Sequence, residues 1–145
     1  MLRGEMELGL CKDICMPHSI SFRAELPAEV TRPDPVIAAS IASIPFSASE
    51  AGVGAVSCDM TLGSDGITLN ARVEMPSAGG QEFVVVETRN PMVWVDEAET
   101  RRSGGALYAE TELMHMEGKP FALDRSGLTI TVIGKNHAVE IHGCS

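Results

Sequence analysis

The sequence has few basic residues and no long apolar run, and both absences narrow its function. Its 145 residues include 11 lysines and arginines against 20 aspartates and glutamates, a formal net charge of −9. Without a basic cluster, the chain lacks the positive surface that attracts nucleic acid or anionic lipid. No apolar run approaches the ~20 residues of a membrane-spanning helix, and the first residues contain no apolar core of a secretion signal. We expect one domain, or one domain plus a fragment, that binds no nucleic acid.

Common catalytic motifs are also missing. The sequence contains neither the Gly-x-Ser-x-Gly motif of many hydrolases nor a glycine-rich loop that would hold phosphate. His115, His137 and His142 do not have the spacing of a metal site, and no cofactor is predicted. The candidates for chemistry are therefore the four cysteines: Cys11, Cys15, Cys58 and Cys144.

Cys11 and Cys15 lie between two runs, 5–10 and 19–26, that alternate apolar and polar residues as half-buried strands do. Four steps of extended chain span about 13 Å, whereas a disulfide needs Cα atoms roughly 4.4 to 6.8 Å apart. If the two cysteines pair, the chain between them must turn back, and Lys12 and Asp13 suit such a turn. A small exposed ring of this kind is easily reduced, which favours a redox pair. A stabilising disulfide and two buried thiols remain alternatives.

The rest of the sequence predicts a linker and a β-sandwich. Residues 27–35 are rich in proline, and Asp34 and Pro35 are typical of a helix start, so we expect a short helix up to Ile44 that packs on a sheet or closes a sandwich edge. Alternating runs separated by turns then predict an all-β, antiparallel, immunoglobulin-like sandwich over 36–145. The expected strands are 55–62, 67–75, 82–88, 92–95, 106–113, 128–133 and 138–141.

Two further groups have structural interpretations. Cys58 lies in the middle of an expected strand on its inward side, and Cys144 follows the last strand. A disulfide between them would stabilise the fold by ~3–5 kcal/mol through loop entropy. The alternative is a buried free thiol and a loose cysteine near the end of the chain. The charged residues between Asp96 and Arg102 are interpreted as a solvated turn.

The segment Gly9-Leu-Cys-Lys-Asp-Ile-Cys-Met-Pro17 resembles the Cys-x3-Cys-x-Pro segment in the periplasmic N-terminal region of DsbD/ScsB-type thiol:disulfide interchange proteins. The resemblance extends over nearly the whole chain, although DsbD itself spaces its paired cysteines more widely. The other segments that carry it are 76–80, 94–101, 120–128 and Gly143-Cys144.

This resemblance implies a function and a compartment. It implies that the cysteine pair accepts electrons from a membrane donor and, once reduced, passes them to periplasmic thiol/disulfide proteins, with Cys15 as the attacking thiol and Cys11 as the resolving one. Relatives carry a secretion signal and a longer β domain before the cysteines. The resemblance therefore implies that this chain is a C-terminal portion, with residues 1–26 as the last hairpin of a DsbD-type domain.

Other hypotheses remain open at this point. Cys11, Cys15, Met16 and His18 offer soft ligands suited to Cu(I) within a short segment. A non-catalytic β-sandwich used for docking is a third hypothesis. Because an isolated hairpin is marginally stable in water, the sequence also suggests a strand-swapped homodimer in which residues 5–26 pair with another copy of the chain.

Overall fold

The structure is a computed structural model that describes residues 1–12, 14–26, 29, 32 and 34–145. The chain forms two compact units, Met1–Ser40 and Ile41–Ser145, which are described separately. The division falls inside the helix, whereas the sequence places the whole helix with the sandwich. The assignment of 1–26 to a separate domain remains a prediction, and most of the expected linker lies outside the described residues.

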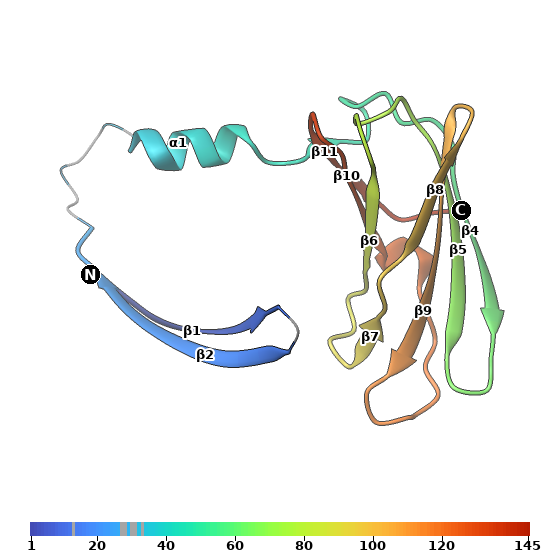
Figure 1. The fold of residues 1–145 in the computed structure, drawn as a ribbon, viewed down its shortest axis with the longest axis horizontal. Helices are drawn as coiled ribbons and strands as arrows, with labels where there is room; N and C mark the ends of the chain where they lie inside the picture. Colours follow the sequence, from blue (N-terminus) through green and yellow to red (C-terminus); the bar gives the residue numbers. More distant parts are fainter. Residues whose placement is uncertain (13, 27–28, 30–31, 33) are drawn as a thin grey trace. The chain divides into compact units, whose positions relative to one another are not determined.

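The first unit contains a hairpin, β1 (Leu2–Cys11) and β2 (Cys15–Ala24), followed by the part of α1 (Pro35–Ala42) that precedes Ile41 (Figure 1). Oδ1 of Asp34 accepts hydrogen bonds from the backbone N–H groups of Val36 (2.8 Å) and Ile37 (3.4 Å), so Asp34 caps the helix as predicted. None of the eight helix residues is buried. The expected packing of this helix on a sheet is therefore not found. No helix in the described part of the chain is long and apolar enough to cross a membrane.

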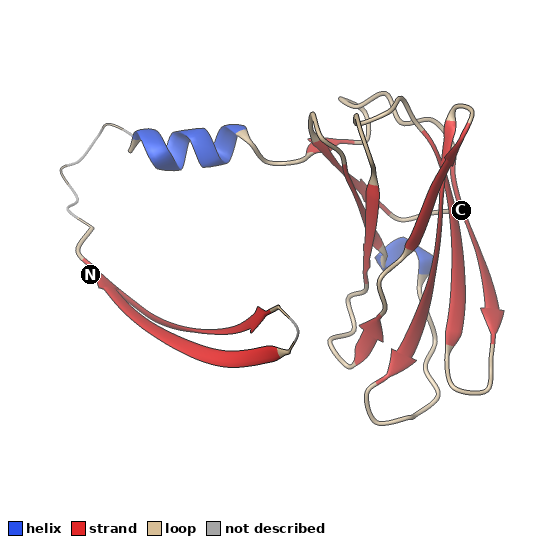
Figure 2. Ribbon diagram, viewed as in Figure 1, coloured by secondary structure: helices blue, strands red, loops and turns tan. Residues whose placement is uncertain are grey.

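The second unit is a two-sheet β-sandwich, as the sequence predicts (Figure 2). One sheet has the order β3-β11-β10-β6, and the other has the order β4-β5-β9-β7, with β8 also paired to β9. The ladders are antiparallel except that between β3 and β11, which is parallel. The strands are β3 (Phe46–Ser47), β4 (Val56–Leu62), β5 (Ile67–Glu74), β6 (Phe83–Glu87), β7 (Val93–Val95), β8 (Glu99–Ser103), β9 (Ala106–His115), β10 (Thr129–Ile133) and β11 (Ala138–His142).

The core of the sandwich follows from the alternation of its strands. In β5, alternate residues from Ile67 to Val73 are buried, and the same pattern recurs at Ile130 and Val132 of β10. Because successive side chains of a strand point to opposite faces, each sheet presents one apolar face to the other. Burial of these faces is the main stabilising contribution to the unit.

The charged segment before β9 forms a strand, although the sequence predicts a turn there. The stretch from Asp96 to Arg102 was expected to be a solvated turn, but Glu99–Ser103 forms β8, which pairs with β9. Alternation places Glu99 and Arg101 outward, with Thr100 and Arg102 partly buried. The strand was missed because its inward charge is neutralised by a residue distant in the sequence.

That partner is Glu82, whose side chain is only 4% exposed. Its carboxylate accepts hydrogen bonds from Nη2 of Arg102 (2.9 Å) and from the backbone N–H of Ala78 (2.7 Å). Nη1 of Arg102 also donates to the carbonyl oxygen of Met75 (2.9 Å). The pKa of Glu82 lies below its ordinary value, mainly because Arg102 donates a hydrogen bond to the carboxylate. Burial of the carboxylate acts in the opposite direction and raises the pKa.

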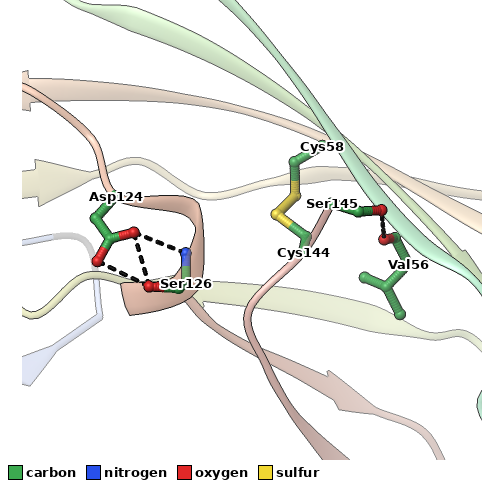
Figure 3. The surroundings of a disulfide bond; sticks show 6 residues. All are labelled: Val56, Cys58, Asp124, Ser126, Cys144 and Ser145. Carbon is green, nitrogen blue, oxygen red and sulfur yellow. Dashed lines mark hydrogen bonds between the residues drawn. A yellow bond between two sulfur atoms is a disulfide. The ribbon is translucent and has the colours of Figure 1, made fainter.

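The Cys58–Cys144 disulfide attaches the end of the chain to β4 (Figure 3). Cys58 is 1% exposed. Beside the disulfide, the backbone N–H of Cys58 donates to the carbonyl oxygen of Ser145 (2.9 Å), and that of Ser145 donates to Val56 (3.1 Å). On the other side, Cys144 donates to the carbonyl oxygen of Arg125 (3.3 Å) in the short 3-10 helix Arg125–Gly127. Hydrogen bonds from Ser126 to Asp124 close the start of that helix (Figure 3). The disulfide and these hydrogen bonds together hold the end of the chain between β4 and the 3-10 helix, which is a structural role.

Removal of Arg102 should destabilise the sandwich. We expect Arg102→Met to lower the free energy of unfolding by about 3 kcal/mol, because it leaves the Glu82 carboxylate buried without its cation. Arg101→Met is the matched control. Its guanidinium lies 4.5 Å from the centre of the half-buried Tyr108 ring, an interaction of about 0.5–1 kcal/mol. Urea unfolding of both variants measures the difference.

The same variants have a predicted pH dependence. Since the folded-state pKa of Glu82 lies below its ordinary value of 4.5, the ion pair contributes fully above that pH and is lost as the pH falls below it. The loss of unfolding free energy caused by Arg102→Met should therefore become smaller in acid. A loss equal to that of Arg101→Met, or one independent of pH, would contradict this role.

Candidate redox site on the hairpin

The β1–β2 hairpin places its two cysteines directly opposite each other. The antiparallel register runs without interruption from the Leu2–Ala24 pair to the Cys11–Cys15 pair at the loop end. The two cysteines form a disulfide with Cα atoms 4.0 Å apart. The backbone N–H of Lys12 donates to the carbonyl oxygen of Ile14 (3.3 Å) within the loop. The chain thus turns back between the cysteines, while Asp13, which was expected to favour this turn, lies outside the described residues.

The register also gives the hairpin two chemically different faces. Residues at even positions of both strands form an apolar face, on which the seven largest apolar side chains are 37–62% exposed. The ring of Phe22 covers Gly4 and occupies the space that a Cβ atom there would need. The opposite face is polar, and there Oγ of Ser19 donates to Oε1 of Glu5 (3.1 Å). Alternation places the disulfide on this polar face.

The two disulfides differ in their exposure to solvent, which governs their reactivity toward thiols. Cys11 and Cys15 are both exposed, whereas Cys58 is 1% exposed and Cys144 is half-buried. Thiol–disulfide exchange requires a thiolate to approach a sulfur atom along the S–S axis, so access decides which disulfide reacts. The hairpin disulfide is therefore the candidate for exchange. The sequence between the two cysteines carries opposite charges: Lys12 favours the thiolate form of a reduced cysteine, whereas Asp13 disfavours it.

The soft ligands considered for Cu(I) are not brought together on the hairpin. The disulfide occupies both cysteine sulfurs. Met16 and His18 face Leu10 and Leu8 in the register, on the apolar face opposite the disulfide. Among the described residues, no group of three or more His, Cys, Asp or Glu side chains could hold a metal ion. The four residues named in the sequence analysis therefore do not form one ligand set in this structure.

Comparisons with known proteins bear on the fold. No protein-family model and no curated protein sequence matches the chain. Among solved structures, the chain is similar to the N-terminal periplasmic domain of ScsB from Proteus mirabilis, with a TM-score of 0.64 and 16% sequence identity. The match covers 97% of this chain and 55% of that one, so the chain spans about half the length of the solved domain. At this identity, the likeness shows a shared fold that includes the hairpin.

The two disulfides should differ in their ease of reduction. We expect a limiting concentration of dithiothreitol, without denaturant, to release the thiols of Cys11 and Cys15 while Cys58 and Cys144 stay paired, because both sulfur-bearing residues are exposed only in the hairpin disulfide. Alkylation followed by peptide mass spectrometry identifies the modified cysteines. Cys58 should become reactive only when urea unfolds the sandwich. Equal modification of all four cysteines in native protein would contradict the difference in access.

Proposed function

We propose that this protein carries out thiol–disulfide exchange through Cys11 and Cys15. The observation that carries the proposal is an exposed disulfide between facing residues at the end of a hairpin, in a chain whose second disulfide joins the buried Cys58 to the half-buried Cys144. A ring closed by three intervening residues keeps the second sulfur beside the first after reduction, which favours resolution of an intermediate over its accumulation. The likeness to the ScsB domain supports the fold on which this chemistry depends.

The exchange transfers two electrons in two displacements. In the reduced protein, the thiolate of Cys15 attacks a disulfide of the oxidised partner, so that a mixed disulfide forms and one partner thiolate leaves. The thiolate of Cys11 then attacks the sulfur of Cys15, the mixed disulfide breaks and the second partner thiolate leaves. Cys11 and Cys15 end as a disulfide, and the partner ends as a dithiol. A dithiol donor regenerates the reduced pair by the reverse sequence.

The compartment and partners belong to the same proposal. Disulfides persist in oxidising compartments and are rare in the cytosol, and the ScsB domain is itself periplasmic. We therefore place the protein in the bacterial periplasm, with oxidised periplasmic proteins as electron acceptors and a membrane protein as the electron donor.

Single cysteine variants test the exchange and the assigned roles. After reduction and incubation with oxidised glutathione, Cys11→Ser should accumulate a glutathione adduct on Cys15, because the resolving thiol is missing. Cys15→Ser should form its adduct on Cys11 more slowly, since Cys15 is assigned the attacking role. Intact mass spectrometry over time measures both adducts.

The equilibrium of the native pair supplies the second test. In glutathione buffers, the Cys11–Cys15 disulfide should open and close reversibly as the buffer potential crosses about −200 mV. A pair that stays wholly free or wholly oxidised throughout that range would contradict the exchange function. Faster adduct formation on Cys11 than on Cys15 would contradict only the assignment of the attacking thiol.

The exposed apolar face of the hairpin favours a homodimer as a second element of the proposal. In this dimer, residues 5–26 pair with another copy of the chain, which would remove large apolar side chains from water. Light scattering coupled to size exclusion should give twice the mass of the chain. Ile20→Glu, on the apolar face, should give a monomer, whereas Ser21→Glu on the polar face should not. A monomeric native protein would contradict this assembly.

A further inference from the structure

Three methionines and the tryptophan gather on the outer face of the sandwich where β7 meets β9. Trp94 faces Met114 in the β7–β9 register. The ladder continues by one pair, since the backbone N–H of Met116 donates to the carbonyl oxygen of Met92 (2.9 Å). Val93, between the outer residues of β7, is 9% exposed, and Leu113, before Met114, is fully buried. Alternation therefore places the four side chains on the side away from the core.

The spacing of these positions suits a shared ligand. Residues that exchange hydrogen bonds across an antiparallel ladder have Cα atoms about 5.5 Å apart, and residues two apart on a strand are about 7 Å apart. The four side chains thus start from the corners of a small rectangle. Methionine has three rotatable bonds before its terminal methyl group, which lets several thioether sulfurs turn toward one point.

Packing within the sandwich does not account for this group. Met92, Trp94, Met114 and Met116 are 36%, 58%, 39% and 65% exposed. The next two outward positions of β9 carry the polar residues Glu112 and Glu110, as expected of a strand with one face in water. Replacement of polar residues by three thioethers and an indole is a local departure from that pattern.

The neighbouring charges attract a cation to this face. The next pair along the ladder is Asp96 and Glu112, joined by the hydrogen bond from the Asp96 N–H to the Glu112 carbonyl oxygen (2.9 Å). Their positions place two carboxylates on the same face as the thioethers. The whole chain adds a formal net charge of −9. The nearby Lys119 forms an ion pair with Glu117, which neutralises the ammonium group.

We propose that Met92, Met114 and Met116 bind one Cu(I) ion, with the indole ring of Trp94 against the cation. Neutral thioethers are soft ligands that select Cu(I) over zinc and other harder divalent ions. The face of an indole ring attracts a cation through its quadrupole. The ion binds as Cu(I) and no electron is transferred. The group belongs wholly to the sandwich, so the site is independent of the hairpin disulfide.

Trp94 provides a local readout, because it is the only tryptophan in the sequence. Under anaerobic conditions and with both disulfides intact, titration with Cu(I) should quench Trp94 fluorescence to saturation at one equivalent. Ag(I), a soft monovalent ion that does not change oxidation state here, should act in the same way. Zn(II) should leave the fluorescence unchanged.

Leucine variants locate the ligands, since Met→Leu keeps an apolar side chain of similar volume. Met114→Leu and Met116→Leu should each weaken Cu(I) binding at least tenfold in competition with bicinchoninate, and the double variant should show no quenching. Met6→Leu is the matched control, because Met6 is an exposed strand methionine of the hairpin. It should bind Cu(I) as the native protein does.

Several results would overturn the site. Quenching that persists in the double variant would place the ion elsewhere, and loss of binding in Met16→Leu or His18→Ala would place it on the hairpin. Equal quenching by Zn(II) would exclude a thioether site. Absence of Cu(I) and Ag(I) binding would leave the group as an apolar surface only. The Cys11→Ser variant should retain the site, which separates this result from the outcome of the exchange experiments.

Discussion

Alternation of side chains along strands held in register is the constraint on which the rest of this structure depends. In the sandwich, it turns one face of each sheet inward and builds a core from residues such as Leu69 and Ile130. In the hairpin, the same period separates an apolar face from a polar one and leaves the Cys11–Cys15 disulfide on the polar side. A register shift of one residue would move the two cysteines out of line, so their position opposite each other is a consequence of pairing.

The two disulfides show how one covalent bond serves different purposes in different surroundings. Cys58 is enclosed by the sandwich and Cys144 is held by backbone hydrogen bonds on both sides, so that bond stabilises the fold by restricting the unfolded chain. Cys11 and Cys15 close a ring at an exposed loop, where a bond between residues so close in sequence restricts the unfolded chain far less. Its accessibility to another thiol is its more consequential property.

Local patterns predicted much of the fold but missed its charged strand. The apolar–polar alternation of β4, β5 and β10, and the turns between strands, are local signals that depend on neighbouring residues alone. The strand Glu99–Ser103 carries no apolar alternation, since one of its inward positions is the charged Arg102. This charge can face inward because Glu82, at a distant point of the chain, neutralises it. The helix start at Asp34 was predictable from its capping residue, whereas the exposure of the helix depends on what surrounds it.

For the candidate site, the sequence by itself determined which atoms are available: two closely spaced cysteines between alternating strands, and soft side chains beside them. Only the tertiary structure decided which of these share a face. It separates Met16 and His18 from the disulfide, and it brings Met92 opposite Met116 and Trp94 opposite Met114 across a ladder. The physical reason is that strand pairing joins residues distant in the sequence, and their register is set by burial of the whole sheet face.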